Sequence, residues 1–276
     1  NNDYGTKKLV SIAELRKYLQ PGYKAVLTIV AQEKEDVYRY NRRYLYDSAE
    51  CRQRTGMVGC VNQGMTCYMN SLLQNLYHTN AFREAIYKIE NDAKMPLALQ
   101  RVFYNLENMP SAISTVELTK SFGWSHVEST QQQDVQEFCR VLFDRLEEKM
   151  KGTPVESALA DLFQGSTLAY IKCINVSKES TREEDFMDLQ MEVKGCSTLI
   201  DSFDKLVEVE MLEGENQYDA EELGKQDAKK GVKLKKLPPV LHLQLRRQEY
   251  DPVTFARRKI NSRLEFPDAM NLDKYM

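Results

Sequence analysis

Residues 59–71 read GCVNQGMTCYMNS, and the fold that we expect is built around this stretch. Gly64 permits a tight turn that other residue types resist. The apolar residues that follow recur at i, i+3, i+4, i+7 and i+8, which is the pattern of one helix face: Met69, Leu72, Leu73, Leu76 and Tyr77. The stretch therefore predicts a turn followed by an amphipathic helix that begins close to Cys67.

A thiol at the start of a helix suits nucleophilic chemistry. The unpaired N–H groups and the positive end of the helix dipole favour the thiolate, which is the reactive form. Asn62 lies five residues earlier, and its amide could donate a hydrogen bond to the oxyanion that forms when Cys67 attacks a carbonyl. One such donor typically lowers the barrier by about 3–4 kcal/mol. Residue by residue, the commoner alternative stays open: a small buried cysteine and a turn-forming asparagine.

The composition is that of a folded domain and excludes several classes of protein. The chain has 276 residues, 42% of them hydrophobic, and 38 basic against 41 acidic residues give a net charge of −3. This balance argues against general nucleic-acid binding. No run approaches the roughly 18 apolar residues of a membrane span. The polar N-terminus has no signal peptide, so we expect an intracellular protein, nuclear or cytoplasmic, without a membrane partner. The missing initiator Met suggests a fragment.

The six cysteines favour free thiols in a reducing compartment over a disulfide framework, since the chain is long and lacks a secretion signal. The chain has no Cys-x-x-Cys pair. Cys173 and Cys196 are too isolated to form a four-ligand zinc site with the three histidines. We expect no metal and no cofactor.

Helical and strand-like patterns divide the rest of the chain. Pro96 and the apolar residues after it predict one helix. Another is predicted around residues 135–146, with a capping box formed by Ser129 and Gln132 or by Thr130 and Gln133. Alternating or β-prone runs at 168–176, 187–193 and 241–245 predict strands, with an acidic insert at 208–227. These patterns indicate an α+β fold.

The N-terminal 54 residues differ from the remainder. Residues 1–33 suggest a helix turn and then a β-branched strand, whereas residues 34–54 are charged and rich in tyrosine. We interpret residues 34–54 as a linker and residues 55–276 as a second unit.

Three ordered motifs resemble those of the ubiquitin-specific proteases, a papain-like family of deubiquitinases. Residues 62–71 are similar to the cysteine box of that family, residues 132–138 to its second helical box, and residues 238–247 to a later strand. The resemblance implies a papain-like ubiquitin-specific protease fold of the α+β class. Its parts are a helical thumb lobe, antiparallel β fingers and a partial palm, truncated at the C-terminus.

Further segments are similar to the herpesvirus-associated branch of the family: residues 96–104, 120–124 and 149–153. Residues 1–33 resemble the end of the MATH (TRAF-like) domain that precedes the catalytic domain in that branch. The resemblance implies a MATH remnant at 1–33 and an incomplete catalytic domain at 55–276. MATH-domain peptide partners are expected only for a longer parent protein.

The resemblance also implies residue roles. Cys67 is the expected nucleophile that attacks the carbonyl after the terminal glycine of ubiquitin, and Asn62 the expected oxyanion donor. Asp134 and Glu137 match acidic positions that hold the arginines of the ubiquitin tail. Their i, i+3 spacing independently places both carboxylates on one helix face, although a solvated acidic face stays an alternative.

Four weaker assignments complete the expected ubiquitin surface. Gln132 and Arg247 are expected to contact the ubiquitin tail, and Trp124 and Tyr68 are possible ubiquitin contacts. Trp124 has the alternative, which we prefer, of lying in the core. Gln248 stands where the family usually has Phe, which could loosen the wall of the tail channel. The fingertip Cys-x-x-Cys pairs of other members are absent, so packing alone must hold the fingers.

The family also needs a general-base histidine, and we identify none in this chain. His78 is 11 residues from Cys67 along the same helix, about 16 Å at 1.5 Å per residue. His126 matches no family base, and His242 has the character of a structural residue. We therefore expect this fragment alone to be inactive or very weak. The alternative function is a non-catalytic ubiquitin-binding or adaptor module, and a MATH-type peptide binder is a weaker third.

Overall fold

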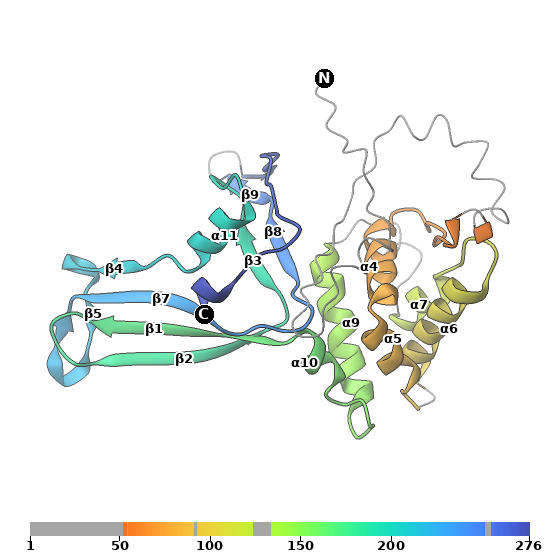
Figure 1. Ribbon diagram of the computed structural model, residues 1–276, viewed down its shortest axis with the longest axis horizontal. Coiled ribbons are helices and arrows are strands. Elements are labelled where there is room, and N and C mark those ends of the chain that lie inside the picture. Colours follow the sequence, from red (N-terminus) through yellow and green to blue (C-terminus); the bar gives the residue numbers. More distant parts are fainter. Residues whose placement is uncertain (1–51, 54, 91–92, 124–133, 252–254) are drawn as a thin grey trace. The chain divides into compact units, whose positions relative to one another are not determined.

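The computed structural model describes residues 52–53, 55–90, 93–123, 134–251 and 255–276. The expected MATH remnant and almost all of the expected linker lie outside these residues, as do Trp124, His126 and Gln132. The chain divides into a helical unit that ends at Leu162 and a mainly β unit from Phe163 to Met276 (Figure 1).

The helical unit contains the predicted amphipathic helices. Its elements are α4 (Cys67–His78), α5 (Asn80–Tyr87), α6 (Lys94–Asn108), α7 (Val116–Ser121) and α9 (Val135–Met150), and α10 (Ala158–Phe163) leads out of it. Their apolar faces form one core in which these side chains are at most 1% exposed: Met69, Leu73, Leu76, Phe82, Leu99, Phe103, Leu118, Phe138, Leu142 and Leu146. The ring of Phe82 lies 6.1 Å from those of Phe103 and Phe143, so aromatic contacts join α5 to α6 and α9.

Helix α6 begins at Lys94, two residues before the predicted start. Pro96 is accepted there because the first-turn N–H groups of a helix have no intrahelical partner. Helix α9 begins at Val135 and is capped by Asp134. The prediction that Ser129 or Thr130 caps this helix is wrong, since Asp134 supplies the oxygen that accepts from the first-turn N–H groups.

The β unit is built on a four-stranded antiparallel sheet with the order β2-β1-β7-β4 (Figure 1). Its strands are β2 (Glu179–Phe186), β1 (Gly165–Cys173), β7 (Ala228–Lys236) and β4 (Glu210–Leu212). Leu168 pairs with Glu183 of β2 and with Lys233 of β7, which sets the register. Strand β1 confirms the β-prone run predicted at 168–176, beginning and ending three residues earlier.

One strand pair departs from the expected antiparallel lobe. Strands β3 (Leu189–Glu192) and β8 (Leu243–Arg246) pair in parallel, with Leu189 opposite Leu243. A parallel pair needs a long crossover, and the excursion through β4 to β7 supplies it. Leu189 and Met191 are buried beside Phe203, as their alternation predicted.

The predicted acidic insert is ordered into short elements at the tip of the four-stranded sheet. They are β4, η2 (Gly214–Asn216), β5 (Tyr218–Asp219), η3 (Glu221–Leu223) and β6 (Lys225–Gln226). Cys173, Ala220 and Ala228 form a small buried cluster beneath them. The ammonium of Lys178 donates to the carbonyl of Ala220 at 3.0 Å, so packing and hydrogen bonds hold the tip together.

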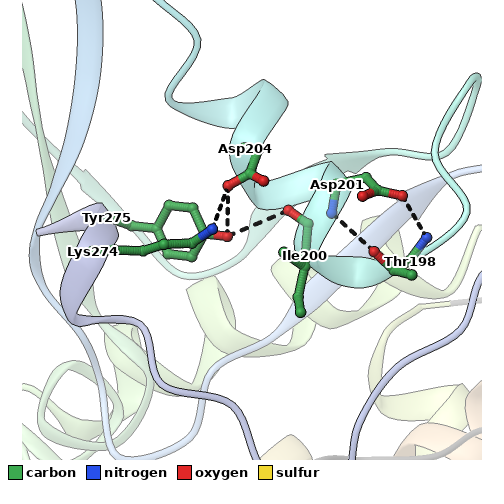
Figure 2. Close-up of polar contacts among 6 residues, drawn as sticks. All are labelled: Thr198, Ile200, Asp201, Asp204, Lys274 and Tyr275. Carbon is green, nitrogen blue, oxygen red and sulfur yellow. Dashed lines mark hydrogen bonds and ion pairs between the residues drawn. The ribbon is translucent and has the colours of Figure 1, made fainter.

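The last described residues pack on helix α11 (Leu199–Leu206), as Figure 2 shows. Thr198 and Asp201 form a capping box at the start of this helix. Asp204 accepts hydrogen bonds from the Tyr275 hydroxyl at 2.9 Å and from the Lys274 ammonium at 2.7 Å (Figure 2). Tyr275 is only 2% exposed, so η4 (Asp273–Tyr275) is part of the core of the β unit.

Two further strands complete this unit: β9 (Gln248–Asp251) and β10 (Ala256–Lys259) form an antiparallel hairpin. None of the helices within the described ranges has the length and apolar character that a membrane span requires.

Candidate active site

Cys67 is the first residue of α4, and its side chain is exposed. Gly64 has a φ of 119°, which confirms the predicted turn, because residues with a Cβ avoid this conformation. Thr66 occupies the N-cap position and is fully buried. The chain thus turns at Gly64, buries Thr66 and then presents the Cys67 thiol to solvent at a helix N-terminus.

Asn62 is held by the residue that precedes the cysteine. Its Oδ1 accepts hydrogen bonds from the backbone N–H and from the hydroxyl of Thr66, both at 3.1 Å. Because an N–H group can only donate, the atom that faces it is the amide oxygen, and the NH2 group is the other end of the side chain. No acceptor for this NH2 group is present among the described residues, and Asn62 is exposed. The donor that oxyanion binding requires is therefore the available end of Asn62.

A second set of contacts holds the loop on the body of the helical unit. The backbone N–H of Val61 donates to the carbonyl of Ile113 at 2.8 Å, and the N–H of Ile113 donates to the carbonyl of Gly59 at 2.9 Å. The side chain of Gln74, on α4, donates to the carbonyl of Val58 at 2.9 Å. These bonds fix both ends of the turn that carries Asn62.

Gln63 connects the same loop to the start of α7. Its Nε2 donates to the hydroxyl oxygen of Thr115 at 2.8 Å, and its Oε1 accepts from the hydroxyl of Thr119 at 3.2 Å. Thr115 is completely buried and Thr119 is 4% exposed. Gln63 and Thr66 lie within the stretch from which the sequence interpretation started, but it assigned them no role. It missed Thr115 and Thr119, for which the sequence offers no signal.

The predicted acidic pair lies at the start of α9. Asp134, the N-cap residue, and Glu137, in the first turn, are both exposed. One oxygen of Asp134 also caps the helix, accepting from the backbone N–H of Gln136 at 2.7 Å and of Glu137 at 3.4 Å. Asp134 is therefore a structural cap as well as an exposed negative charge.

Helices α4 and α9 begin at the same end of the helical unit (Figure 1). The rings of Tyr68 and Phe138, each in the first turn of its helix, meet edge to face with centroids 5.9 Å apart. Tertiary packing therefore brings Cys67 and the acidic pair, which are far apart in sequence, to one end of this unit.

Tyr68 is 8% exposed, which argues against the expectation that it contacts a partner protein. Its side chain belongs to the packed interface between α4 and α9. The hydroxyl oxygen is buried and has no hydrogen-bond partner among the described residues. Burial, and to a lesser degree the nearby Cys67 group, raises the pKa of Tyr68.

The two described histidines, His78 and His242, each pack against an aromatic ring. His78, the last residue of α4, packs edge to face on Tyr77, and burial together with Arg83 lowers its pKa. His242 lies in the β unit with its ring 4.9 Å from that of Phe163, and burial lowers its pKa against the opposing effect of Asp188. His78 is at the opposite end of α4 from Cys67 and is not its base.

Arg247 is half-buried and holds part of the β unit together. Its Nη1 donates to the carbonyl oxygens of Ser262 at 2.8 Å and of Ile260 at 3.3 Å. The expected contact of Arg247 with a ubiquitin tail stays a prediction, as do the roles of Trp124 and Gln132, which lie outside the described residues.

Among the described residues, the cysteines other than Cys67 form neither a disulfide nor a metal-binding group. Cys60 is half-buried, and burial raises its pKa to about 11, which suppresses its thiolate. Within the described ranges, no three His, Cys, Asp or Glu side chains gather as a metal site would require.

Comparison with known proteins gives one consistent result. Residues 58–276 match the family model described as ubiquitin carboxyl-terminal hydrolase. The chain is 49% identical over 279 residues to "Ubiquitin C-terminal hydrolase 12" of Arabidopsis thaliana, a match that covers 99% of this chain and 25% of that protein.

Fungal and animal relatives agree with this match. The chain is 53% identical over 230 residues to "Ubiquitin carboxyl-terminal hydrolase 15" of Schizosaccharomyces pombe, covering 82% of this chain and 20% of the relative. It is 46% identical over 280 residues to "Ubiquitin carboxyl-terminal hydrolase 7" of Drosophila melanogaster, covering 100% and 24%. The chain spans about a quarter or less of the length of these relatives.

Proposed function

This chain belongs to the ubiquitin carboxyl-terminal hydrolase family, and we propose that it carries the nucleophile of a cysteine-dependent deubiquitinase. The proposed reaction is hydrolysis of the isopeptide bond after the C-terminal glycine of ubiquitin on protein conjugates. The Cys67 sulfur forms a bond to the carbonyl carbon, and the carbonyl oxygen becomes an oxyanion. The oxyanion then re-forms the carbonyl, and the bond to the lysine nitrogen breaks as that nitrogen takes up the proton that was removed from the thiol. Water later attacks the thioester, which releases ubiquitin with a free carboxylate and returns the proton to the Cys67 sulfur.

One observation carries this proposal: an exposed thiol and an oriented amide donor stand on the same turn. Cys67 is exposed at the first position of α4, and Thr66 directly before it fixes the oxygen end of Asn62. Preoriented donors are the largest single source of stabilisation in many acyl-transfer sites because they need no reorganisation during the reaction. An adaptor module that only binds ubiquitin has no use for this arrangement.

The acidic pair supports ubiquitin as the partner. Asp134 and Glu137 place two exposed carboxylates at the start of α9, and α9 begins at the same end of the helical unit as α4, whose first residue is Cys67 (Figure 1). Carboxylates pair well with arginine, whose fork of donors matches their geometry. We assign these two residues to the basic C-terminal tail of ubiquitin.

The proposed reaction also needs a general base that removes the proton of the Cys67 thiol. His78 is the histidine in the described part of the helical unit, and it lies at the far end of α4. We propose that another residue of the intact protein removes the thiol proton. Weak turnover by this chain alone stays a prediction.

The test uses ubiquitin with an electrophilic C-terminus and the intact protein. We expect a covalent adduct, seen as a mass increase of one ubiquitin, that is lost in Cys67→Ala. Cys60→Ala is the matched control and should label as the wild type does, since the Cys60 thiol is half-buried with a pKa of about 11. Absence of labelling together with retained ubiquitin binding would instead identify an adaptor module.

Several finer assignments belong to the same proposal. We assign residues 1–33 to a MATH remnant, residues 34–54 to a linker, and the protein to the herpesvirus-associated branch of the family. The likeness to the Arabidopsis relative, which extends over nearly the whole chain, supports assigning a family role to the N-terminal residues. The reduced cysteines support a nuclear or cytoplasmic location. The net charge of −3 supports the absence of a nucleic-acid partner.

A further inference from the structure

Three buried threonines lie next to the loop that carries Asn62. Burial of a hydroxyl is unfavourable unless the hydroxyl has a hydrogen-bond partner. Thr66 and Thr115 are completely buried and Thr119 is 4% exposed. Each has a hydrogen bond to Asn62 or Gln63. These three hydroxyls and the side chains of Asn62 and Gln63 therefore form a network in which each hydroxyl has a hydrogen-bond partner.

The bonds form a continuous path from α7 to the amide of Asn62. Thr115 accepts from the side chain of Gln63 at 2.8 Å. The backbone N–H of Gln63 donates to the Thr66 hydroxyl at 3.0 Å, and that hydroxyl donates to Oδ1 of Asn62 at 3.1 Å. The Thr66 hydroxyl uses its single hydrogen toward Asn62 and a lone pair toward Gln63, so both of its bonds form at once.

We propose that Gln63 and Thr115 are positioning residues that aim the NH2 group of Asn62 at the oxyanion. This inference rests on the proposed function. Neither residue has to touch the substrate: Gln63 holds the loop, and Thr115, the N-cap residue of α7, holds Gln63. A displacement of about 1 Å at a catalytic group can reduce the rate about 10²-fold, so the bonds that hold the middle of this turn are sensitive positions even though both of its ends are fixed.

The side chain of Gln63 is held at both ends. Its NH2 group faces Thr115 and its oxygen faces Thr119, whose hydroxyl also lies 3.0 Å from the carbonyl of Val116. A threonine hydroxyl can donate as well as accept, so a glutamate at position 63 could still bond to both threonines. Gln63→Met has no amide and therefore removes both links with little change in volume.

Thr115→Val removes the hydroxyl and keeps the volume, and Thr115→Ser restores the hydroxyl. Ser114→Ala is the matched control, because Ser114 is an exposed neighbour whose hydroxyl, among the described residues, accepts from the N–H of Val116 alone, at 3.3 Å. Steady-state hydrolysis of a ubiquitin–fluorophore conjugate by the intact protein gives kcat and KM for each variant. We expect Thr115→Val and Gln63→Met to lower kcat at least tenfold with KM unchanged, and Thr115→Ser and Ser114→Ala to stay near the wild type.

A double-variant experiment separates positioning from general loss of structure. If Thr115 acts through Asn62, then Thr115→Val should have no further effect on kcat in an Asn62→Ala background. An equal further loss in that background, or a Thr115→Val enzyme as active as Ser114→Ala, overturns the proposal. Thermal unfolding of each variant shows that the fold is retained at the assay temperature.

A readout independent of activity distinguishes failure of this inference from failure of the proposed function. The side-chain ¹⁵N–¹H signals of Asn62 report the order of its amide. We expect Thr115→Val, but not Ser114→Ala, to shift and broaden them. If the wild type neither hydrolyses conjugates nor labels with the ubiquitin probe, the proposed function fails, and these signals alone decide whether Thr115 orients Asn62. Unchanged signals in Thr115→Val refute the positioning role.

Discussion

Replacing Asp134 with asparagine should separate the two roles of this residue, the helix cap and the negative charge. Oδ1 of Asp134 accepts from two first-turn N–H groups of α9, at 2.7 Å from Gln136 and 3.4 Å from Glu137. Asparagine has the same acceptor and caps helices about as well as aspartate. Asp134→Asn should therefore keep the cap and remove only the charge, whereas Asp134→Ala removes both.

The magnitudes follow from the exposure of the carboxylate. Loss of an N-cap side chain typically costs about 1 kcal/mol, so Asp134→Ala should lower the free energy of unfolding by about that amount. Asp134→Asn should change it by less than about 0.5 kcal/mol, the range of ordinary surface substitutions. For ubiquitin binding, an exposed ion pair contributes up to about 1 kcal/mol, which is about a fivefold change in Kd. Both variants should show this weakening, and added salt should reduce it.

Urea unfolding measures stability, and calorimetric titration with ubiquitin at low and high salt measures binding. Asp134→Arg is less informative, because it removes the cap and also places a positive charge at a helix N-terminus, which is itself unfavourable. If Asp134→Asn binds ubiquitin as tightly as the wild type at low salt, the assignment of Asp134 to the ubiquitin tail is refuted. Equal stabilities of Asp134→Ala and Asp134→Asn would refute the capping role.

Two further variants test features of the core. Tyr68→Phe removes a buried hydroxyl that has no partner among the described residues. The free energy of unfolding, measured in urea, should therefore stay the same or rise by up to about 1 kcal/mol. A decrease in this free energy would show that the hydroxyl is satisfied. The Lys274 ammonium and the Tyr275 hydroxyl lower the pKa of Asp204 from its ordinary value of 3.8, so the stability that this carboxylate contributes is present above that value and is lost as the pH falls through the lowered one. The melting temperature of wild type should thus exceed that of Asp204→Asn at neutral pH and converge with it in acid, and a constant difference would contradict this.

Local features of the site were predictable from the sequence because their causes lie within a few residues. The spacing of Met69, Leu73 and Leu76 predicted α4, because a helix repeats every 3.6 residues wherever its apolar face packs. Gly64 predicted the turn because its backbone conformation excludes other residue types. The i, i+3 spacing predicted that Asp134 and Glu137 lie close together on a helix, and both are exposed at the start of α9, Asp134 as the residue that caps it.

Features that depend on distant partners were decided only by the tertiary structure. The sequence does not show that Gln63 meets Thr115, 52 residues later, because hydrogen bonds across the core carry no sequence period. The parallel pairing of β3 with β8 and the burial of Tyr68 against Phe138 likewise depend on how elements pack. Asp134 rather than Ser129 or Thr130 caps α9 because packing of the apolar face sets where that helix begins. The sequence, through its resemblance to a known family, thus predicted a nucleophile and its donor, while long-range packing decides how the side chain of Asn62 is held.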